Sequence, residues 1–198
     1  MKRILVIFLT FMSLFLQNAI CAQQSPPRYR EQEISPSGDM VIEYRYDYAK
    51  EHHEVWLKSI EDTLSPVFLY EFSRDAKVMV SPDEQWLIIN NHMGSDISEV
   101  ILFRKTTALK FTELKTRNIS GKSWQFFCRK NKITELTFHH QYAECLMWSS
   151  DSRYLLLKLS GYENGSNYAD SWLCIYDIEK DAFSTDLSQM NRKAVKVE

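Results

Sequence analysis

Three segments of the chain share one pattern of polar and apolar positions. In each, a short polar turn precedes a bulky residue and a run of aliphatic residues. Serine, proline and aspartate favour tight turns and aliphatic runs favour strands, so each segment predicts a turn between two antiparallel strands. The segments are residues 35–42, 81–89 and 149–157.

The similarity extends to the strands on either side of these turns. One strand precedes each turn, at residues 31–34, 77–80 and 144–148. A third strand is expected at 54–58, 99–103 and 172–177, and a fourth at 67–72, 109–114 and 182–187. We therefore predict an all-β chain with one β-repeat domain over residues 30–188. Its three four-stranded antiparallel units span about 30–75, 76–115 and 143–188.

The spacing of the repeats locates an insertion. Ser35 and Ser81 are 46 residues apart, whereas Ser81 and Ser149 are 68 apart. The second interval therefore holds about 22 additional residues, which fit the stretch 116–142 because the repeat pattern is broken there.

The insertion is predicted to be partly helical. Residues 120–130 favour a short helix with Ser120 as its cap. Residues 133–138 alternate between apolar and polar and predict an additional strand. On one side of the helix the spacing places Trp124, Phe127 and Cys128.

This repeated pattern resembles the WD-like repeats of β-propellers. Its parts are a polar turn, a bulky residue, an aliphatic strand, a polar loop and a Trp/Ile/Leu-rich strand that ends in aspartate. The similarity is to the Tol-system periplasmic propeller and to the N-terminal propellers of the prolyl oligopeptidase family, and it covers residues 30–188. It implies propeller-like blades, which pack on both faces and so suit apolar runs such as 86–89. Propellers usually have four to eight blades. With about three blades, this chain would form an open or unusually small stack, or a second chain would complete the ring. The alternative fold is a β-sandwich or a barrel.

The first residues have the pattern of a cleaved signal peptide. Lys2 and Arg3 precede an apolar run at 4–16, and Ala22 provides a small residue at a cleavage point. We predict a signal peptide at 1–22, a polar leader at 23–29 and a C-terminal tail at 189–198. The protein is then exported and is periplasmic or secreted. The apolar run is too short to span a bilayer, so no membrane span is expected; Cys21 as a lipidation site is the alternative.

Composition and charge limit the classes of partner that the protein is expected to bind. The chain has 24 basic and 26 acidic side chains, and loss of Lys2 and Arg3 with the signal peptide leaves 22 against 26. This balance provides no basic surface for nucleic acid. Three cysteines remain at 128, 145 and 174. Export permits one disulfide, for which Cys128 and Cys145 are the candidate pair; the alternative is three small buried hydrophobic residues.

The loops between the second and third strands of each unit should meet at one end of the domain, which we call the rim. Loops on a rigid scaffold commonly carry binding residues, and Tyr, Trp and Asn make adaptable contacts. Solvated loops without function are the alternative. Our candidate binding residues are Tyr48, His52, His53, His92, Asp96, Trp124, Tyr162, Tyr168 and Asp170.

No catalytic motif or cofactor motif is found, and we predict neither catalytic residues nor a cofactor. Neighbouring histidines on an extended segment point to opposite sides, so the pairs at 52–53 and 139–140 predict no metal site. The sequence favours an exported, non-catalytic binding protein that presents its rim to a protein or envelope ligand, or that self-associates. The alternatives are a small exported hydrolase using residues such as Asp47, His53 and Asp170, and an inhibitor or immunity-type protein.

Overall fold

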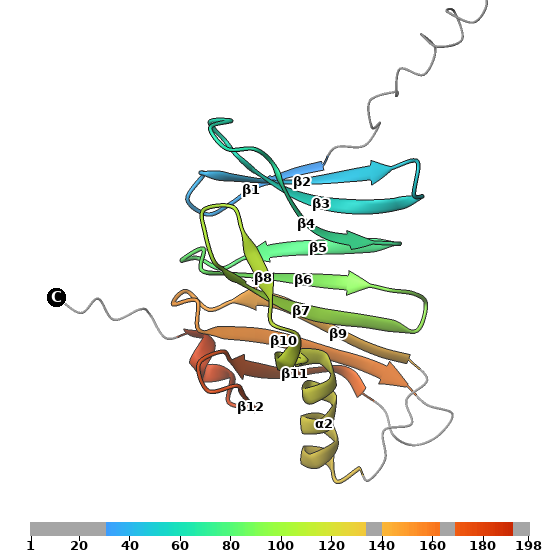
Figure 1. The fold of residues 1–198 in the computed structure, drawn as a ribbon. Coiled ribbons are helices and arrows are strands. Elements are labelled where there is room, and N and C mark those ends of the chain that lie inside the picture. Colours follow the sequence, from blue (N-terminus) through green and yellow to red (C-terminus); the bar gives the residue numbers. More distant parts are fainter. Residues whose placement is uncertain (1–30, 134–139, 163–168, 192–198) are drawn as a thin grey trace, which may run out of the picture.

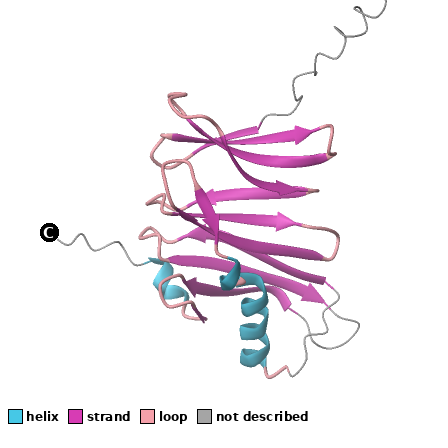
Figure 2. Ribbon diagram, in the orientation of Figure 1, coloured by secondary structure: helices cyan, strands magenta, loops and turns pink. Residues whose placement is uncertain are grey.

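Strands dominate the architecture of the chain. The computed structural model describes residues 31–133, 140–162 and 169–191, so the predicted signal peptide, the polar leader and most of the tail lie outside the described residues. Three antiparallel four-stranded meanders follow one another along the chain and stack in space (Figures 1 and 2). The predicted all-β, propeller-like fold class is confirmed.

Each meander corresponds to one predicted unit. Unit 1 contains β1 (Glu31–Ile34), β2 (Met40–Asp47), β3 (His52–Ser59) and β4 (Val67–Phe72). Unit 2 contains β5 (Asp75–Val80), β6 (Trp86–His92), β7 (Ile97–Lys105) and β8 (Phe111–Glu113). Unit 3 contains β9 (His140–Trp148), β10 (Tyr154–Tyr162), β11 (Ala169–Asp177) and β12 (Ala182–Ser184), followed by the 3-10 helix η2 (Leu187–Asn191).

The repeated turn serine performs the same task in all three units. Its backbone N–H donates to the carbonyl of the residue five positions later, and its hydroxyl accepts from that residue's N–H. For Ser149 and Tyr154 both distances are 2.8 Å. The other pairs are Ser35 with Met40 and Ser81 with Trp86. All three serines are buried, so the repeated motif closes each turn between the first two strands.

The three units are joined in two different ways. Unit 1 is a separate four-stranded sheet, whereas units 2 and 3 share one sheet because β7 pairs in parallel with β9. The buried side chain of Asn90 strengthens this connection. Its amide donates to the Cys145 carbonyl and its carbonyl accepts from the Cys145 N–H, both at 2.8 Å.

Within the described residues the core consists of two apolar clusters, one at each junction. Strand β6 supplies both, because Leu87 and Ile89 face unit 1 while Ile88 faces unit 3, and none of the three is exposed. A strand covered on both faces has a continuous rather than an alternating apolar run, as the sequence indicated.

The insertion contains α2 (Ile119–Asn131), which packs over the second core cluster. Trp124, Phe127 and Cys128, which the spacing placed on one side of the helix, are all buried. The predicted cap was wrong: the side chain of Asn118 caps the helix by accepting from Gly121 N–H. Ser120 instead accepts a hydrogen bond from Val100 N–H at 2.7 Å and so fastens the helix to β7. Most of the strand predicted at 133–138 lies outside the described residues.

The predicted Cys128–Cys145 disulfide is not formed. Cys128, Cys145 and Cys174 are all free and buried among apolar side chains, which is the alternative that the sequence left open. Burial raises the pKa of each thiol, that of Cys174 to about 12, which disfavours the reactive thiolate. Among the described residues, no helix has the length and apolar character needed to cross a bilayer.

Candidate functional site: the rim and the cleft between units 1 and 2

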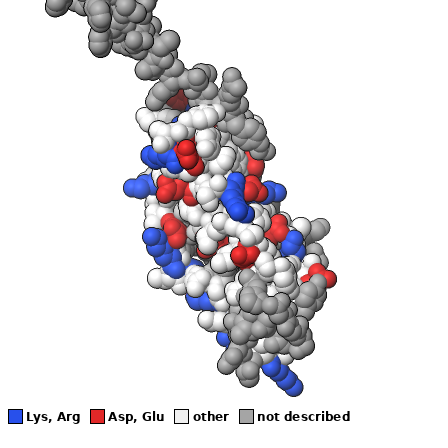
Figure 3. All heavy atoms as spheres, turned by 90° about the vertical axis from the view of Figure 1, so that its right-hand side faces the viewer, with Lys and Arg blue, Asp and Glu red and all other residues white. Residues whose placement is uncertain are grey.

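Two of the three loops expected at the rim lie at one end of the stack, and most of the third, 163–168, lies outside the described residues. The β2–β3 and β6–β7 turns reach the right-hand side of Figure 1, where β5 and β9 also begin. Figure 3 views this end directly. Acidic and basic side chains are interspersed over the part it describes, and neither sign forms a continuous patch.

At units 2 and 3 the rim is closed by a cluster around His140. The imidazole stacks on the Tyr162 ring with centroids 4.0 Å apart, and its Nδ1 lies 3.0 Å from a carboxylate oxygen of Asp96. The hydroxyl of Tyr142 donates to the carbonyl of Ser95. The structure therefore brings together two predicted residues, Asp96 and Tyr162, and joins the β6–β7 loop to the first and second strands of unit 3.

At unit 1 the rim is aromatic. Tyr46 contacts both Tyr48 and His53, with ring centroids 4.8 Å apart in each pair. His53 in turn stacks on Phe72 at 5.0 Å. Tyr48 is 58% exposed and is thus available to a partner.

A cleft of about 730 Å³ separates the rim ends of units 1 and 2. Its charged residues are of both signs, and its aromatic wall includes the Tyr44, His53 and Phe72 side chains. The Tyr44 hydroxyl accepts a hydrogen bond from Val78 N–H at 2.9 Å and donates to Glu33 at 3.3 Å, so this wall is anchored. The lining residues are Glu33, Tyr44, His53, Phe72, Arg74, Asp75, Ala76 and Lys77.

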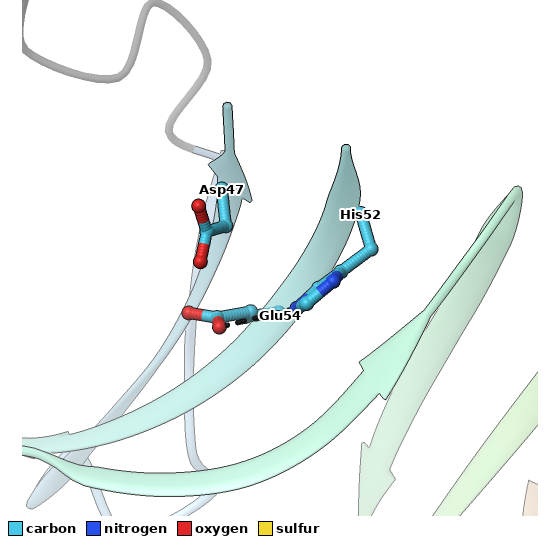
Figure 4. Close-up of side chains that lie close together, drawn as sticks. All are labelled: Asp47, His52 and Glu54. Atoms are coloured by element: carbon cyan, nitrogen blue, oxygen red, sulfur yellow. Dashed lines mark hydrogen bonds and ion pairs between the residues drawn. The ribbon is translucent and has the colours of Figure 1, made fainter. Parts of the chain in front are cut away.

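His52 lies on the other side of β3, away from unit 2, and Figure 4 shows its neighbours. Asp47 and Glu54 converge on it, and potential ligand atoms of the three residues lie within 4.8 Å of one another. Lys50 forms ion pairs with Asp47 at 3.4 Å and Glu54 at 3.6 Å. This group could hold a metal ion.

The pKa values of both carboxyl groups in this cluster are lowered. For Asp47 the main cause is the hydrogen bond from Ala49 N–H, with Lys50 adding to it. Burial acts to raise the pKa of Glu54, but hydrogen bonds from Trp56 and His52 and the charge of Lys50 together outweigh it. Both groups are therefore ionised, as metal ligands must be.

The other candidate residues are dispersed. His92 is half-buried at the end of β6 and Asp170 is exposed on β11, while Tyr168 lies outside the described residues. Trp124 was wrongly expected at the rim: it is only 2% exposed because α2 turns it into the core. The hydrolase residues do not assemble as one group, since Asp47 pairs with His52 and the His53 ring contacts Phe72 on the opposite side of β3.

Sequence reasoning missed several residues of this region. Arg74, Asp75 and Lys77 line the cleft, and Glu54 and Glu71 lie beside His52. The predicted strand began at Glu54, two residues after the observed start of β3 at His52. Alternation over the longer strand places His52 and Glu54 on one face.

Comparisons with known proteins show only distant likenesses. No family model matches the chain, and no curated protein matches it. Among solved structures, "Kuenenia stuttgartiensis Hydrazine Synthase" is similar, with 13% identity and a TM-score of 0.43 over 78% of this chain and 40% of that one. "The beta-propeller domain of the Trilobed protease from Pyrococcus furiosus reveals an open velcro topology" has 14% identity and a TM-score of 0.32, over 75% and 54% of the two chains. The chain thus spans about half or less of the length of each.

Proposed function

We propose that this chain is an exported, non-catalytic binding protein that takes a segment of a partner protein in the cleft between units 1 and 2. The observation that carries the proposal is the cleft itself. It opens at the junction that has no strand pairing between its two sheets, beside the exposed Tyr48. The proposal includes export through the signal peptide at 1–22 and the WD-like character of the three units.

The chemistry of the cleft suits a polypeptide. Arg74 and Lys77 can pair with acidic side chains of a partner, and Glu33 and Asp75 with basic ones. The aromatic wall and Tyr48 offer large, rigid contact area at low entropic cost, as protein-binding surfaces commonly do. Because both charge signs are present side by side, the cleft favours a segment of mixed charge over a polyanion such as nucleic acid.

The test is a quantitative capture experiment with two matched variants. The immobilised chain is exposed to the envelope fraction and culture medium of the source organism, and bound proteins are quantified by mass spectrometry. Arg74→Glu with Lys77→Glu reverses two exposed charges in the cleft. Lys110→Glu with Lys180→Glu makes the same change on exposed lysines at the opposite end of the units.

The expected result is a stoichiometric protein held equally by the wild type and the Lys110/Lys180 variant, and reduced about tenfold or more by the Arg74/Lys77 variant. If that protein is an enzyme whose activity falls on binding, the function is that of an inhibitor. If it is the chain itself, the cleft serves self-association. Equal capture by all three proteins, equal loss in both variants, or no stoichiometric partner would contradict the proposal.

Export is tested separately. Cell fractionation is expected to place the protein in the periplasm or medium, and N-terminal sequencing should find the chain beginning at Gln23. Recovery of the intact chain from Met1 in the cytosol would contradict export.

A further inference from the structure

We propose that Asp47, His52, Glu54 and Glu71 form a binding site for a divalent transition-metal ion, of which Zn²⁺ is the clearest case. The site lies at the rim end of unit 1, on the side of the sheet away from unit 2. It is separate from the cleft, because the cleft is lined by His53 and Phe72, which occupy the opposite face of β3 and β4.

The strand register gathers the four residues on one face. Asp47 is the cross-strand partner of His52, the first residue of β3. Glu54 follows His52 by two residues and therefore points to the same side. Glu71 on β4 is the cross-strand partner of Glu54. Three adjacent strands thus present an imidazole and three carboxylates to one small volume.

The distances fit coordination by a common ion. His52 Nε2 lies 3.3 Å from Glu54 Oε1 and 3.5 Å from Glu71 Oε2. Ligand atoms bound tetrahedrally to Zn²⁺ at 2.0–2.2 Å are roughly 3.3–3.6 Å from one another. The spacing of His52 from Glu54 and from Glu71 therefore already suits a shared ion. Asp47 has ligand atoms within 4.8 Å of those of His52 and Glu54, whereas the exposed Glu71 would close on the ion by a side-chain rotation. Imidazole with carboxylates is a donor set that suits Zn²⁺ and neighbouring transition metals.

Hydrogen bonds from outside the site orient two of the carboxylates. The indole N–H of Trp56 donates to Glu54 Oε2 at 2.8 Å, so Oε1 is the oxygen presented to His52. Asp47 Oδ1 accepts from the N–H groups of Ala49 and Lys50, which leaves Oδ2 for an ion. Such outer partners fix ligand orientation and commonly raise metal affinity.

The charge balance also favours a dication. Three carboxylates surround His52, and among the described residues Lys50 is the basic side chain that forms ion pairs with two of them. Lys50 is 62% exposed and can swing into solvent. Arg45, the next basic residue along β2, is occupied with Glu43 and lies over the Trp56 ring. A divalent ion would therefore replace the ammonium group of Lys50 and neutralise the carboxylates more completely.

The experiment is a titration of the purified, chelator-treated chain with Zn²⁺, followed by calorimetry and by thermal unfolding. We expect one saturable zinc site per chain and a higher unfolding midpoint with the metal. Substitution with Co²⁺ should give the visible absorption of a tetrahedral nitrogen and oxygen site, which a loose surface association does not produce. Ca²⁺, which prefers oxygen ligands alone, should bind much more weakly.

Two variants and one control locate the site. His52→Ala should weaken zinc binding at least about tenfold and abolish the cobalt absorption. Glu54→Gln keeps the shape of the side chain and should also weaken binding, which guards against a loss of folding as the cause. His53→Ala removes the neighbouring imidazole on the opposite face and should retain the wild-type zinc affinity. The proposal is overturned if the wild type binds no stoichiometric zinc, or if all three variants bind it equally well.

Discussion

Strand pairing adds main-chain bonds to the side-chain contacts at the junction between units 2 and 3, whereas the junction between units 1 and 2 has no strand pairing. At the first, β7 and β9 pair in one sheet and Asn90 bonds the Cys145 backbone twice. At the second, two separate sheets meet through an apolar cluster and through contacts such as Tyr44 with Val78 N–H.

The difference explains why a cleft lies between units 1 and 2. The His140 cluster and the strand pairing bring the rim ends of units 2 and 3 into contact. Units 1 and 2 lack strand pairing, so their rim ends remain apart and leave the space lined by His53, Arg74 and Lys77. Apolar packing holds sheets together without fixing their edges, and functional openings are expected at such places.

The largest expected effect concerns the packing of unit 3 beside the tighter junction. Gly161 lies on β10, which pairs with β9, and a Cβ there would come within 2.3 Å of the His140 carbonyl oxygen and 2.9 Å of the Trp124 ring. Gly161→Ala should therefore destabilise the protein by about 3 kcal/mol, measured by urea denaturation. Gly94→Ala is the control: nothing lies within 4 Å of its Cβ, and the free energy of unfolding should change by less than about 0.5 kcal/mol.

The second prediction compares substitutions of two neighbouring asparagines, which face different junctions. Asn90→Ala leaves a buried N–H and a buried carbonyl of Cys145 without their partner, at a cost of about 2 kcal/mol. Asn91→Ala removes a bond to the Tyr70 hydroxyl and should cost about 1 kcal/mol. Equal losses, measured by denaturation under the same conditions, would show that the two junctions do not differ as described.

A smaller effect depends on pH and concerns units 1 and 2. Burial acts to raise the pKa of Glu84, but the hydrogen bond from Ser37 N–H and the charge of Lys105 lower it below its ordinary value of 4.5. A carboxyl whose pKa is lower in the folded state stabilises the protein above that ordinary value and loses this contribution as pH falls through the folded-state value. Glu84→Gln should cost about 1–2 kcal/mol at pH 7 and clearly less at pH 3. A pH-independent difference between the two proteins would contradict this account.

The smallest effect is expected at the exposed aromatic rim. Tyr48→Ala removes a side chain that is 58% exposed, so the free energy of unfolding should change by less than about 0.5 kcal/mol in thermal denaturation. A loss above about 1.5 kcal/mol would mean that Tyr48 supports the fold rather than being available to a partner.

Local patterns were enough to predict the repeats, because each turn carries its own serine and each strand its own apolar run. Trp124 shows where such reasoning fails. The spacing within the helix placed it on one side together with Phe127 and Cys128, and its position in an insertion at the rim suggested binding. In the structure, packing of α2 over unit 3 turns that side into the core. The cysteines were ambiguous for a similar reason, since both a disulfide and burial suit apolar segments.

The cleft and the His52 cluster depend on geometry that the sequence does not contain. Glu33, His53 and Lys77 come from three strands in two sheets, and only the angle between the sheets brings them to one opening. The Asp47–His52 pairing depends on the register of the β2–β3 hairpin, which the turn determines. Within a single strand, however, alternation alone placed His52 and His53 on opposite faces, and the structure agrees.

Hydrogen exchange of the backbone amides, measured strand by strand, tests the contrast between the junctions most directly. Amides of β2 and β3 should exchange through an opening of lower free energy than amides of β6, β7, β9 and β10, because unit 1 can separate from unit 2 without breaking a strand pair. The same opening free energy across both sheets would contradict the view that units 1 and 2 form the looser, partner-accessible junction.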